Sequence, residues 1–247
     1  MTVHENRTVV MVTGAQSGIG AAVTAAFRSA GQCVAACDLD PEIVGLPHGY
    51  HVDVTDSVAV DNAVEVIESE LGKIVTLVNC AGILRPGSLL DMTDADWEKT
   101  QAVNATGVFY VTRAVGSRMA QRKAGAIVTV ASNAALVPRM DLGAYAASKA
   151  AAAHLTRCFG LELAAHGIRC NVVAPGSTDT PMLQDLLAGK GATSLIEGNL
   201  SQHRLGIPLR RIATPDDIAD AVVYLASEQA RHITMQELTV DGGASLR

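Results

Sequence analysis

The sequence predicts an α/β protein built on a doubly wound parallel sheet. Short runs rich in β-branched residues alternate with alanine-rich segments of helical length. The runs are almost continuously apolar, which is typical of parallel strands that are covered by helices on both faces. The first run is followed at once by the glycine-rich stretch TGAQSGIG, which opens the first helical segment. We therefore expect a single Rossmann-type domain over residues 1–247, with a seven-stranded parallel sheet.

The expected elements follow this alternation along the chain. Strands are predicted at 8–13, 33–37, 50–54, 74–79, 126–132, 168–174 and 237–241, and helices near 18–30, 57–71, 94–121, 145–166 and 215–227. The last helix has the clearest start, because Thr214 is a good N-cap and Pro215 suits the first helical position. The segment 177–207 has several glycines, short amphipathic pieces and no predicted strand, so we expect a mobile flap beside a pocket rather than a second domain.

Composition limits the classes of function. The chain of 247 residues has 49% hydrophobic and 18% charged residues, and its net charge is -6. An acidic protein of this kind lacks the broad basic face that nucleic acids require, and its partner is expected to be a small molecule. The start has no signal-peptide pattern and no apolar run is long enough to span a membrane, so a cytoplasmic location is expected. The five cysteines show no metal-ligand spacing, and no metal site is predicted.

The stretch TGAQSGIG supplies Gly14, Gly18 and Gly20 between a predicted strand and a predicted helix. Glycines at such positions allow a tight turn and a close approach of the backbone to a pyrophosphate, which lies at the positive end of the helix. A glycine motif alone also occurs in ordinary turns. The position of this motif between a strand and a helix is therefore what predicts a dinucleotide site.

Residues after the second and third strands predict which dinucleotide binds. Asp38 can accept hydrogen bonds from both ribose hydroxyls and repels a 2′-phosphate. Neither Gln16 nor Leu39 supplies the cation that usually binds a 2′-phosphate, so NAD is favoured over NADP. Asp53 is expected at the adenine edge, with Val54 packing nearby. Both aspartates also have a simpler interpretation, Asp38 as a turn residue in DLDP and Asp53 as a loop cap.

Tyr145 and Lys149 lie four residues apart in the stretch AYAASKAA and share one helix face. A free tyrosine has a pKa near 10, which makes it a poor base at neutral pH. An ammonium group close by favours the phenolate, and so does the positive nicotinamide ring of an oxidised cofactor. The pair therefore predicts a tyrosine with a lowered pKa that accepts a proton. On spacing alone, an ordinary alanine-rich helix is the simpler interpretation.

Taken together, these motifs resemble the short-chain dehydrogenase/reductase family over almost the whole chain. The shared features are TGxxxGIG, NCAG at 79–82, PGxxxT at 175–180, a terminal DGG, and the set Asn104, Ser132, Tyr145 and Lys149. The resemblance implies that Tyr145 is the acid/base and that Lys149 binds the nicotinamide ribose and lowers the tyrosine pKa. It implies that Ser132 hydrogen-bonds the reacting oxygen, that Asn104 holds a water in the proton relay, and that the protein is a homotetramer.

The expected cofactor contacts come from the glycine loop, the two aspartate positions and this resemblance. They are Gly14, Gln16, Ser17, Gly18, Ile19, Gly20, Asp38, Leu39, Asp53, Val54, Asn79, Ala81, Gly82, Tyr145, Lys149, Pro175, Gly176, Thr178 and Thr180.

Longer stretches resemble one branch of the family. AGILRPG (81–87), AIVTVASNAALVPR (126–139), GIRCNVVAPGSTDTPM (167–182) and ITMQELTVDGG (233–243) are similar to the 2,3-dihydro-2,3-dihydroxybenzoate dehydrogenases of catechol siderophore biosynthesis. The resemblance implies oxidation of a ring alcohol to a ketone, with NAD as the acceptor, followed by enolisation to a catechol. Such a substrate carries a carboxylate, for which Arg85 and Arg139 are the candidate ligands.

Two other functions fit the same motifs. The first is an oxidoreductase for another cyclic alcohol, a sugar or an oxoacyl substrate, because the catalytic set does not specify the substrate. A reductase of carrier-bound oxoacyl groups is expected to prefer NADPH, and Asp38 argues against it. The second is a protein that senses a dinucleotide without turning it over, against which the complete catalytic set argues.

Overall fold

The computed structural model describes residues 7–189 and 191–246. Seven parallel strands form one sheet in the order β3-β2-β1-β4-β5-β6-β9. These strands are β1 (Thr8–Thr13), β2 (Cys33–Asp38), β3 (Gly49–His51), β4 (Lys73–Asn79), β5 (Gly125–Val130), β6 (Ile168–Pro175) and β9 (Glu237–Val240). The strand order reverses between β1 and β4, and ligands of α/β sheets bind beyond the carboxyl ends at such a point. The predicted doubly wound fold with a seven-stranded parallel sheet is confirmed.

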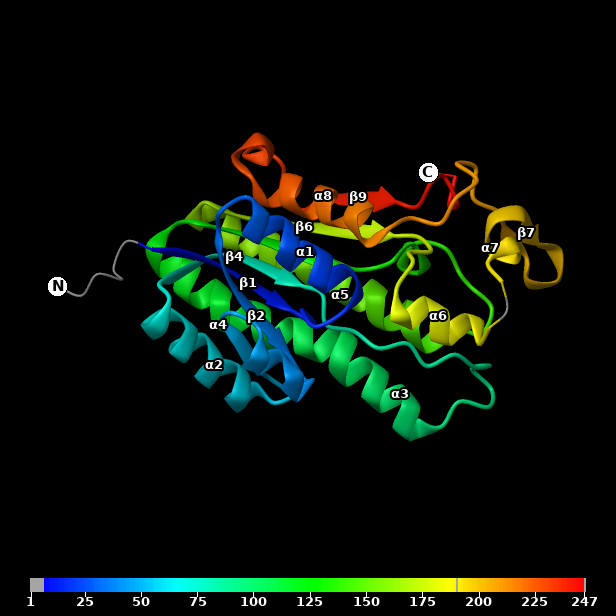
Figure 1. Cartoon of the computed structure of the whole chain (residues 1–247), viewed down its shortest axis with the longest axis horizontal. Coiled ribbons are helices and arrows are strands. Elements are labelled where there is room, and N and C mark those ends of the chain that lie inside the picture. Colours follow the sequence, from blue (N-terminus) through cyan, green and yellow to red (C-terminus); the bar gives the residue numbers. More distant parts are fainter. Residues whose placement is uncertain (1–6, 190, 247) are drawn as a thin grey trace.

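Helices cover both faces of the sheet (Figure 1). On one face, α1 (Gly18–Ser29) packs against α8 (Pro215–Ala226), which begins with the predicted Thr214 cap. The other face carries α2 (Ser57–Glu70), α4 (Gly107–Arg122) and α5 (Gly143–Leu163). None of the helices in the described part of the chain is long and apolar enough to cross a bilayer.

The range predicted as one helix at 94–121 contains a change of hydrogen-bond pattern. It comprises α3 (Asp94–Gln101), a π-turn at Ala102–Thr106 and then α4. π-Turns within helices are rare and often mark functional sites. The candidate site residue Asn104 lies inside this turn.

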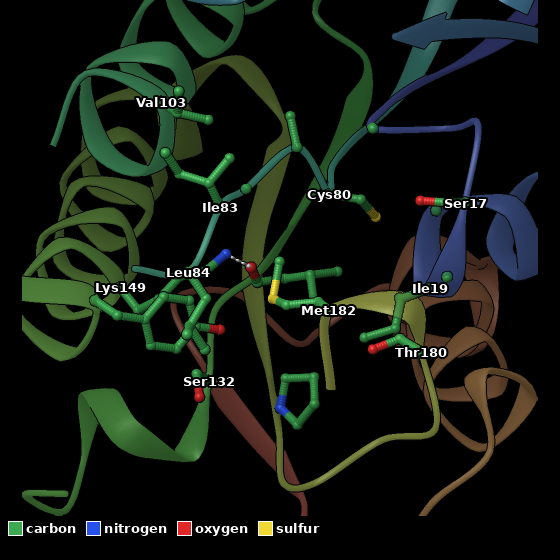
Figure 2. Close-up of a pocket in the computed structure, with 18 of the residues that line it drawn as sticks. Ser17, Ile19, Cys80, Ile83, Leu84, Val103, Ser132, Lys149, Thr180 and Met182 are labelled. Atoms are coloured by element: carbon green, nitrogen blue, oxygen red, sulfur yellow. Dashed lines mark hydrogen bonds between the residues drawn. The ribbon is translucent and has the colours of Figure 1, made fainter. Parts of the chain in front are cut away.

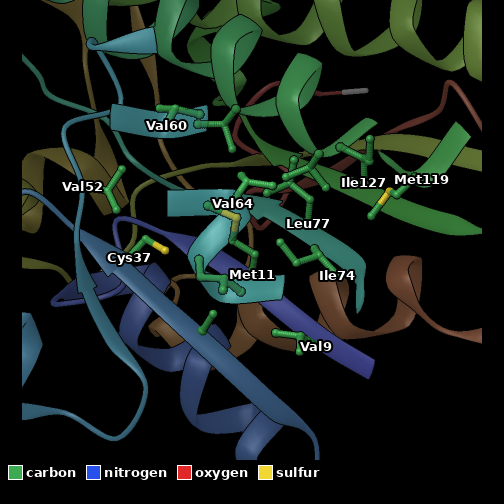
Figure 3. Packing of buried hydrophobic residues seen from close by; sticks show 14 of the residues in the cluster. Val9, Met11, Cys37, Val52, Val60, Val64, Ile74, Leu77, Met119 and Ile127 are labelled. Carbon is green, nitrogen blue, oxygen red and sulfur yellow. The ribbon is translucent and has the colours of Figure 1, made fainter. Parts of the chain in front are cut away.

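Alternating strand residues divide the core into two layers. In β1, Val9 and Met11 belong to the cluster under α2 and α4, which Figure 3 shows. Their neighbours Val10 and Val12 belong to the cluster under α1 and α8. Side chains that alternate between two apolar layers explain why the strand sequences are continuously hydrophobic.

The segment 177–207 contains more order than predicted, although residue 190 lies outside the described residues. It forms α6 (Pro181–Leu187), α7 (Thr193–Glu197) and an antiparallel pair, β7 (Gly198–Asn199) with β8 (Arg204–Leu205). The prediction that this segment has no strand was therefore wrong, because strands of two residues are too short to show an alternating pattern. In Figure 1, α6, α7 and β7 lie beyond the carboxyl end of the sheet.

The central strand gives a direct test of the core. Leu77 in β4 is 0% exposed and lies in the cluster under α2 and α4. Leu77→Ala should lower the free energy of unfolding by about 2–5 kcal/mol, because it removes buried apolar contacts and leaves a cavity. Leu90→Ala is the matched control, since Leu90 is 95% exposed and should change stability by less than about 0.5 kcal/mol. Urea denaturation measures both, and equal effects would contradict this core.

Candidate active site

A cavity of about 730 Å³ lies at the carboxyl edge of the sheet. Its walls come from the segments that follow β1 to β6, from the start of α5 and from α6. Figure 2 shows Ser17 and Ile19 on one side of the cavity, with Ser132 and Lys149 on the other. The cavity is large enough for the nicotinamide end of a dinucleotide together with a small substrate.

The glycine loop is shaped by contacts that only glycine permits. Gly14 and Gly18 have φ angles of +67° and +53°, in the left-handed region that favours glycine. A Cβ on Gly14 would lie 2.7 Å from the backbone of Ala81, and one on Gly20 would lie 1.9 Å from the carbonyl oxygen of Gly14. Ser17 caps α1 without using its side chain. The loop therefore presents backbone N–H groups and a helix N-terminus to the cavity, as the pyrophosphate of NAD requires.

Asp38 is fixed against the glycine loop. Its carboxylate accepts the backbone N–H of Gln16 at 2.9 Å and that of Asp40 at 3.0 Å. The carboxylate therefore makes the turn contact that its simpler interpretation requires, and it also lines the cavity beside Leu39. Asp53 likewise lines the cavity while it accepts hydrogen bonds from the backbone and hydroxyl of Thr55.

Tyr145, Lys149 and Ser132 meet at the opposite end of the cavity. The Lys149 Nζ atom lies 5.9 Å from the centroid of the Tyr145 ring and donates a hydrogen bond to the Val130 carbonyl at 2.9 Å. Ser132 follows β5, and its hydroxyl accepts the backbone N–H of Ala134 at 3.1 Å. The shared helix face predicted for Tyr145 and Lys149 is thus present, and all three candidate catalytic side chains line one cavity.

The pKa of Tyr145 differs in direction from the sequence prediction. Burial raises the Tyr145 pKa above its usual value, although a hydrogen bond from Ser132 opposes this. Burial also lowers the pKa of Lys149 to about 8. The expected lowering of the tyrosine pKa by Lys149 is therefore not seen in the chain alone, because desolvation of the phenolate outweighs the effects of its neighbours.

Asn104 connects the turn after β4 to α5 through its side chain. Its Oδ1 accepts the Ile83 N–H at 2.8 Å, and its Nδ2 donates to the Ile83 carbonyl and to the Ser148 hydroxyl, both at 2.9 Å. The residue is fully buried and is not among those that line the cavity. These contacts connect the turn after β4 to α5, while the water-binding role stays a prediction.

Three further candidates also lie off the cavity wall. Gln16 contacts Asp38 through its backbone, while its side-chain Oε1 is buried without a partner among the described residues. Asn79 is buried, and its amide donates to the hydroxyls of Thr112 and Thr129. Arg85 is half exposed and lies 4.0 Å from the carboxylate of Asp96. The structure therefore favours Arg139, which does line the cavity, over Arg85 as a substrate ligand.

The sequence analysis missed part of the cavity wall. Several lining side chains that could contact a substrate were not predicted. They are Leu84, Lys99, Val103, Leu142, Met182, Leu186 and Arg204. The position of Leu84 just after NCAG is a signal that could have identified it. Arg204 has no such signal, since its position depends on how the segment 177–207 folds.

The buried Lys149 predicts an unusual dependence of stability on pH. Its pKa is about 8 in the folded chain against a reference of 10.5, so the folded state favours the neutral amine. Stability from this group is greatest above the unfolded pKa and is lost as pH falls through about 8. Lys149→Met removes this loss. As pH falls from about 10 to 7, the free energy of unfolding of the variant should therefore rise relative to that of wild type, by up to about 3 kcal/mol. Chemical denaturation at both pH values measures it, and a constant difference would refute the assignment.

Comparison with known proteins gives matches over nearly the full chain. A family model described as Enoyl-(Acyl carrier protein) reductase matches residues 14–245. A 2,3-dihydro-2,3-dihydroxybenzoate dehydrogenase of Bacillus subtilis is 50% identical over 250 residues, covering 96% of both chains. The enzyme of the same name from Escherichia coli is 44% identical over 239 residues, again covering 96% of both.

A solved structure extends this likeness to three dimensions. The ligand-free aldohexose dehydrogenase of Thermoplasma acidophilum superposes with a TM-score of 0.87 at 32% identity, covering 98% of this chain and 95% of that one. The glycine loop and the Tyr145 end of the cavity both fall within the residues matched by the family model. The chain belongs to the short-chain dehydrogenase/reductase family of oxidoreductases, as its motifs predicted.

Proposed function

We propose that this enzyme oxidises 2,3-dihydro-2,3-dihydroxybenzoate to 2,3-dihydroxybenzoate with NAD, as a step in catechol siderophore biosynthesis. Two near full-length relatives carry the name of this activity. The observation that carries the proposal in this chain is Arg139, a cation on the cavity wall in the loop between Ser132 and Tyr145. A guanidinium at that point suits the carboxylate that distinguishes this substrate from other cyclic diols.

The residues around the reacting carbon have separate roles. Ser132 holds the ring hydroxyl by a hydrogen bond, and Tyr145 accepts its proton as the carbon is oxidised to a ketone. NAD, when bound, supplies the hydride acceptor and a positive ring that favours the phenolate of Tyr145. Lys149, on the same helix face, donates to the nicotinamide ribose. The ketone then enolises to the catechol, and the aromatic product makes oxidation the favoured direction.

The cavity wall suits a ring beside the cofactor. Apolar surface is provided by Ile83, Leu84, Val103 and Met182 (Figure 2). Leu142 also lines the cavity. Apolar walls with a few fixed polar groups are typical of small-molecule sites. These side chains exclude water from the carbon that loses hydride. The charged contact to the substrate carboxylate is then made by Arg139.

The assembly and location belong to the same proposal. A homotetramer in the cytoplasm is expected, with α4 and α5 at one interface between subunits. Leu161 of α5 is 70% exposed, and a subunit contact on this helix would cover its apolar surface. Light scattering of the purified full chain tests the tetramer directly.

Asp38 should determine the choice of cofactor. Asp38→Ala removes a carboxylate that accepts ribose hydroxyls and repels a 2′-phosphate, so NAD binding should weaken by about 1–3 kcal/mol while NADP binding improves. The ratio of kcat/KM for NAD and NADP measures the change. Asp40→Ala is the control, because Asp40 is a neighbouring cavity carboxylate without a predicted ribose contact. Equal use of both cofactors by the unchanged enzyme would contradict the assignment.

The activity itself is tested by anaerobic mixing with NAD and 2,3-dihydro-2,3-dihydroxybenzoate, followed by NADH absorbance and product fluorescence. We expect turnover by the unchanged enzyme and almost none by Tyr145→Phe, which loses the proton acceptor but keeps the nucleotide cavity. Calorimetry should show that the variant still binds NAD.

Other results would favour the alternative functions. Turnover of another cyclic alcohol, a sugar or an oxoacyl substrate, with none of the dihydrodiol, would support a related oxidoreductase. NAD binding without turnover of any substrate would support a dinucleotide sensor. Wild-type activity in Tyr145→Phe would remove the proposed base.

A further inference from the structure

The ionised groups on the cavity wall are sorted by sign along its length. Asp38, Asp40 and Asp53 lie on the wall at the end formed by the glycine loop and the turns after β2 and β3. The lining cations lie toward the Tyr145 end and are Lys99, Arg139, Lys149 and Arg204. The cavity therefore has a positive end that is suited to an anion, even though the chain as a whole has a net charge of -6.

Two of these cations have no assigned partner for their charge. Lys149 donates to the Val130 carbonyl beside Tyr145, and Lys99 is an exposed residue of α3 that water can solvate. Arg139 and Arg204 are both partly buried, and neither forms an ion pair within 4.0 Å in the part of the chain that the structure describes. Partly buried charges without an ion-pair partner are costly, so such a pair of cations suits an anionic ligand.

Arg139 has an unused donor inside the protein. Its Nη2 atom is fully buried and has no hydrogen-bond partner among the described residues. Burial lowers the pKa of this guanidinium, and the charge of Asp241 opposes that shift. The Asp241 carboxylate accepts hydrogen bonds from Asn133, Gly243 and Ser245, and none of the ion pairs among the described residues joins it to Arg139.

Arg204 comes from β8, far from Arg139 in the sequence, and is held at the same end of the cavity. Its Nη2 donates to the Ser177 hydroxyl at 2.8 Å, just after β6. Burial lowers the Arg204 pKa, and the charge of Arg139 lowers it further. Both arginines line the same cavity, so an anion bound between them would offset the repulsion between two like charges.

We propose that Arg204 is a second ligand for the substrate carboxylate, which it binds together with Arg139. This inference rests on the proposed function. Each guanidinium offers paired N–H donors, and a carboxylate has enough lone pairs to accept from both. Ser177 is a positioning residue, because it fixes Arg204 by a hydrogen bond.

The test compares two rings that differ only in the carboxylate, 2,3-dihydroxybenzoate and catechol. Calorimetry with the full chain saturated with NADH gives the affinity for each ring. We expect wild type to prefer the carboxylated ring, and Arg204→Gln to lose about 10- to 100-fold in affinity for it, the range for a hydrogen bond to a charged group. Affinity for catechol should change less than about twofold. The variant with both Arg139→Gln and Arg204→Gln should bind the two rings equally.

Four further variants act as controls. Arg85→Gln should retain the preference, because Arg85 lies off the cavity wall beside Asp96. Lys99→Gln should also retain it, and loss of the preference in that variant alone would assign the carboxylate to Lys99 instead. Ser177→Ala should weaken binding of the carboxylated ring less than Arg204→Gln does, again without changing the affinity for catechol. Arg204→Lys should recover part of the loss, since it restores the charge.

The outcomes separate this inference from the function on which it rests. Turnover of the dihydrodiol together with an unchanged ring preference in Arg204→Gln would overturn the role of Arg204 and leave the function intact. A wild-type chain that neither turns over the dihydrodiol nor prefers the carboxylated ring would overturn both. Equal weakening for both rings in Arg204→Gln would show a purely structural role and would also overturn the inference.

Discussion

The close contact between the carboxyl ends of β1 and β4 is the constraint on which the rest of the site depends. The Thr13 hydroxyl accepts the N–H groups of Cys80 and Ala81 at 3.2 and 3.3 Å, which ties the end of one strand to the turn after the other. Gly14 then lies so close to Ala81 that a Cβ would come within 2.7 Å of its backbone. The glycine loop and the NCAG turn therefore pack together as one surface of the cavity. Because α1 begins in the glycine loop, this contact also fixes the position of α1. A substitution at this contact would move both halves of the site together.

A chain of hydrogen bonds extends from the NCAG turn to α5. Ile83, just after the NCAG turn, is bound through both backbone groups by the Asn104 side chain, which also donates to Ser148. Ser148 in turn donates to the Tyr145 carbonyl at 2.7 Å. The π-turn is what brings a buried amide on a long helix to this junction. The distance between the glycine loop and Tyr145 is therefore set by rigid polar contacts, as the proposed role of Tyr145 in catalysis requires.

The sequence predicted those parts of the fold and site that depend on residues close together in the chain. The strands of β1 and β4 follow from continuous apolar runs, and the loop at Gly14 follows from a motif between strand and helix. The π-turn could not be predicted, because it depends on Asn104 meeting Ile83 across the fold. The raised pKa of Tyr145 in the chain without NAD could not be predicted for a similar reason, since helix spacing reveals the Lys149 neighbour but not the desolvation by burial. Arg204 was missed because only the fold of the segment 177–207 brings it to the cavity.

The polarity of the cavity resolves a conflict between an acidic protein and an anionic substrate. With a net charge of -6, the chain cannot attract an anion over long distances. Attraction must be local, and it is strongest where water is partly excluded, as around Arg139 and Arg204. In the two-arginine site that we propose, Arg139 and Arg204 repel one another, and a bound carboxylate would offset that repulsion. A neutral ring would not offset the repulsion, so the proposed pair of arginines would discriminate between substrates by charge.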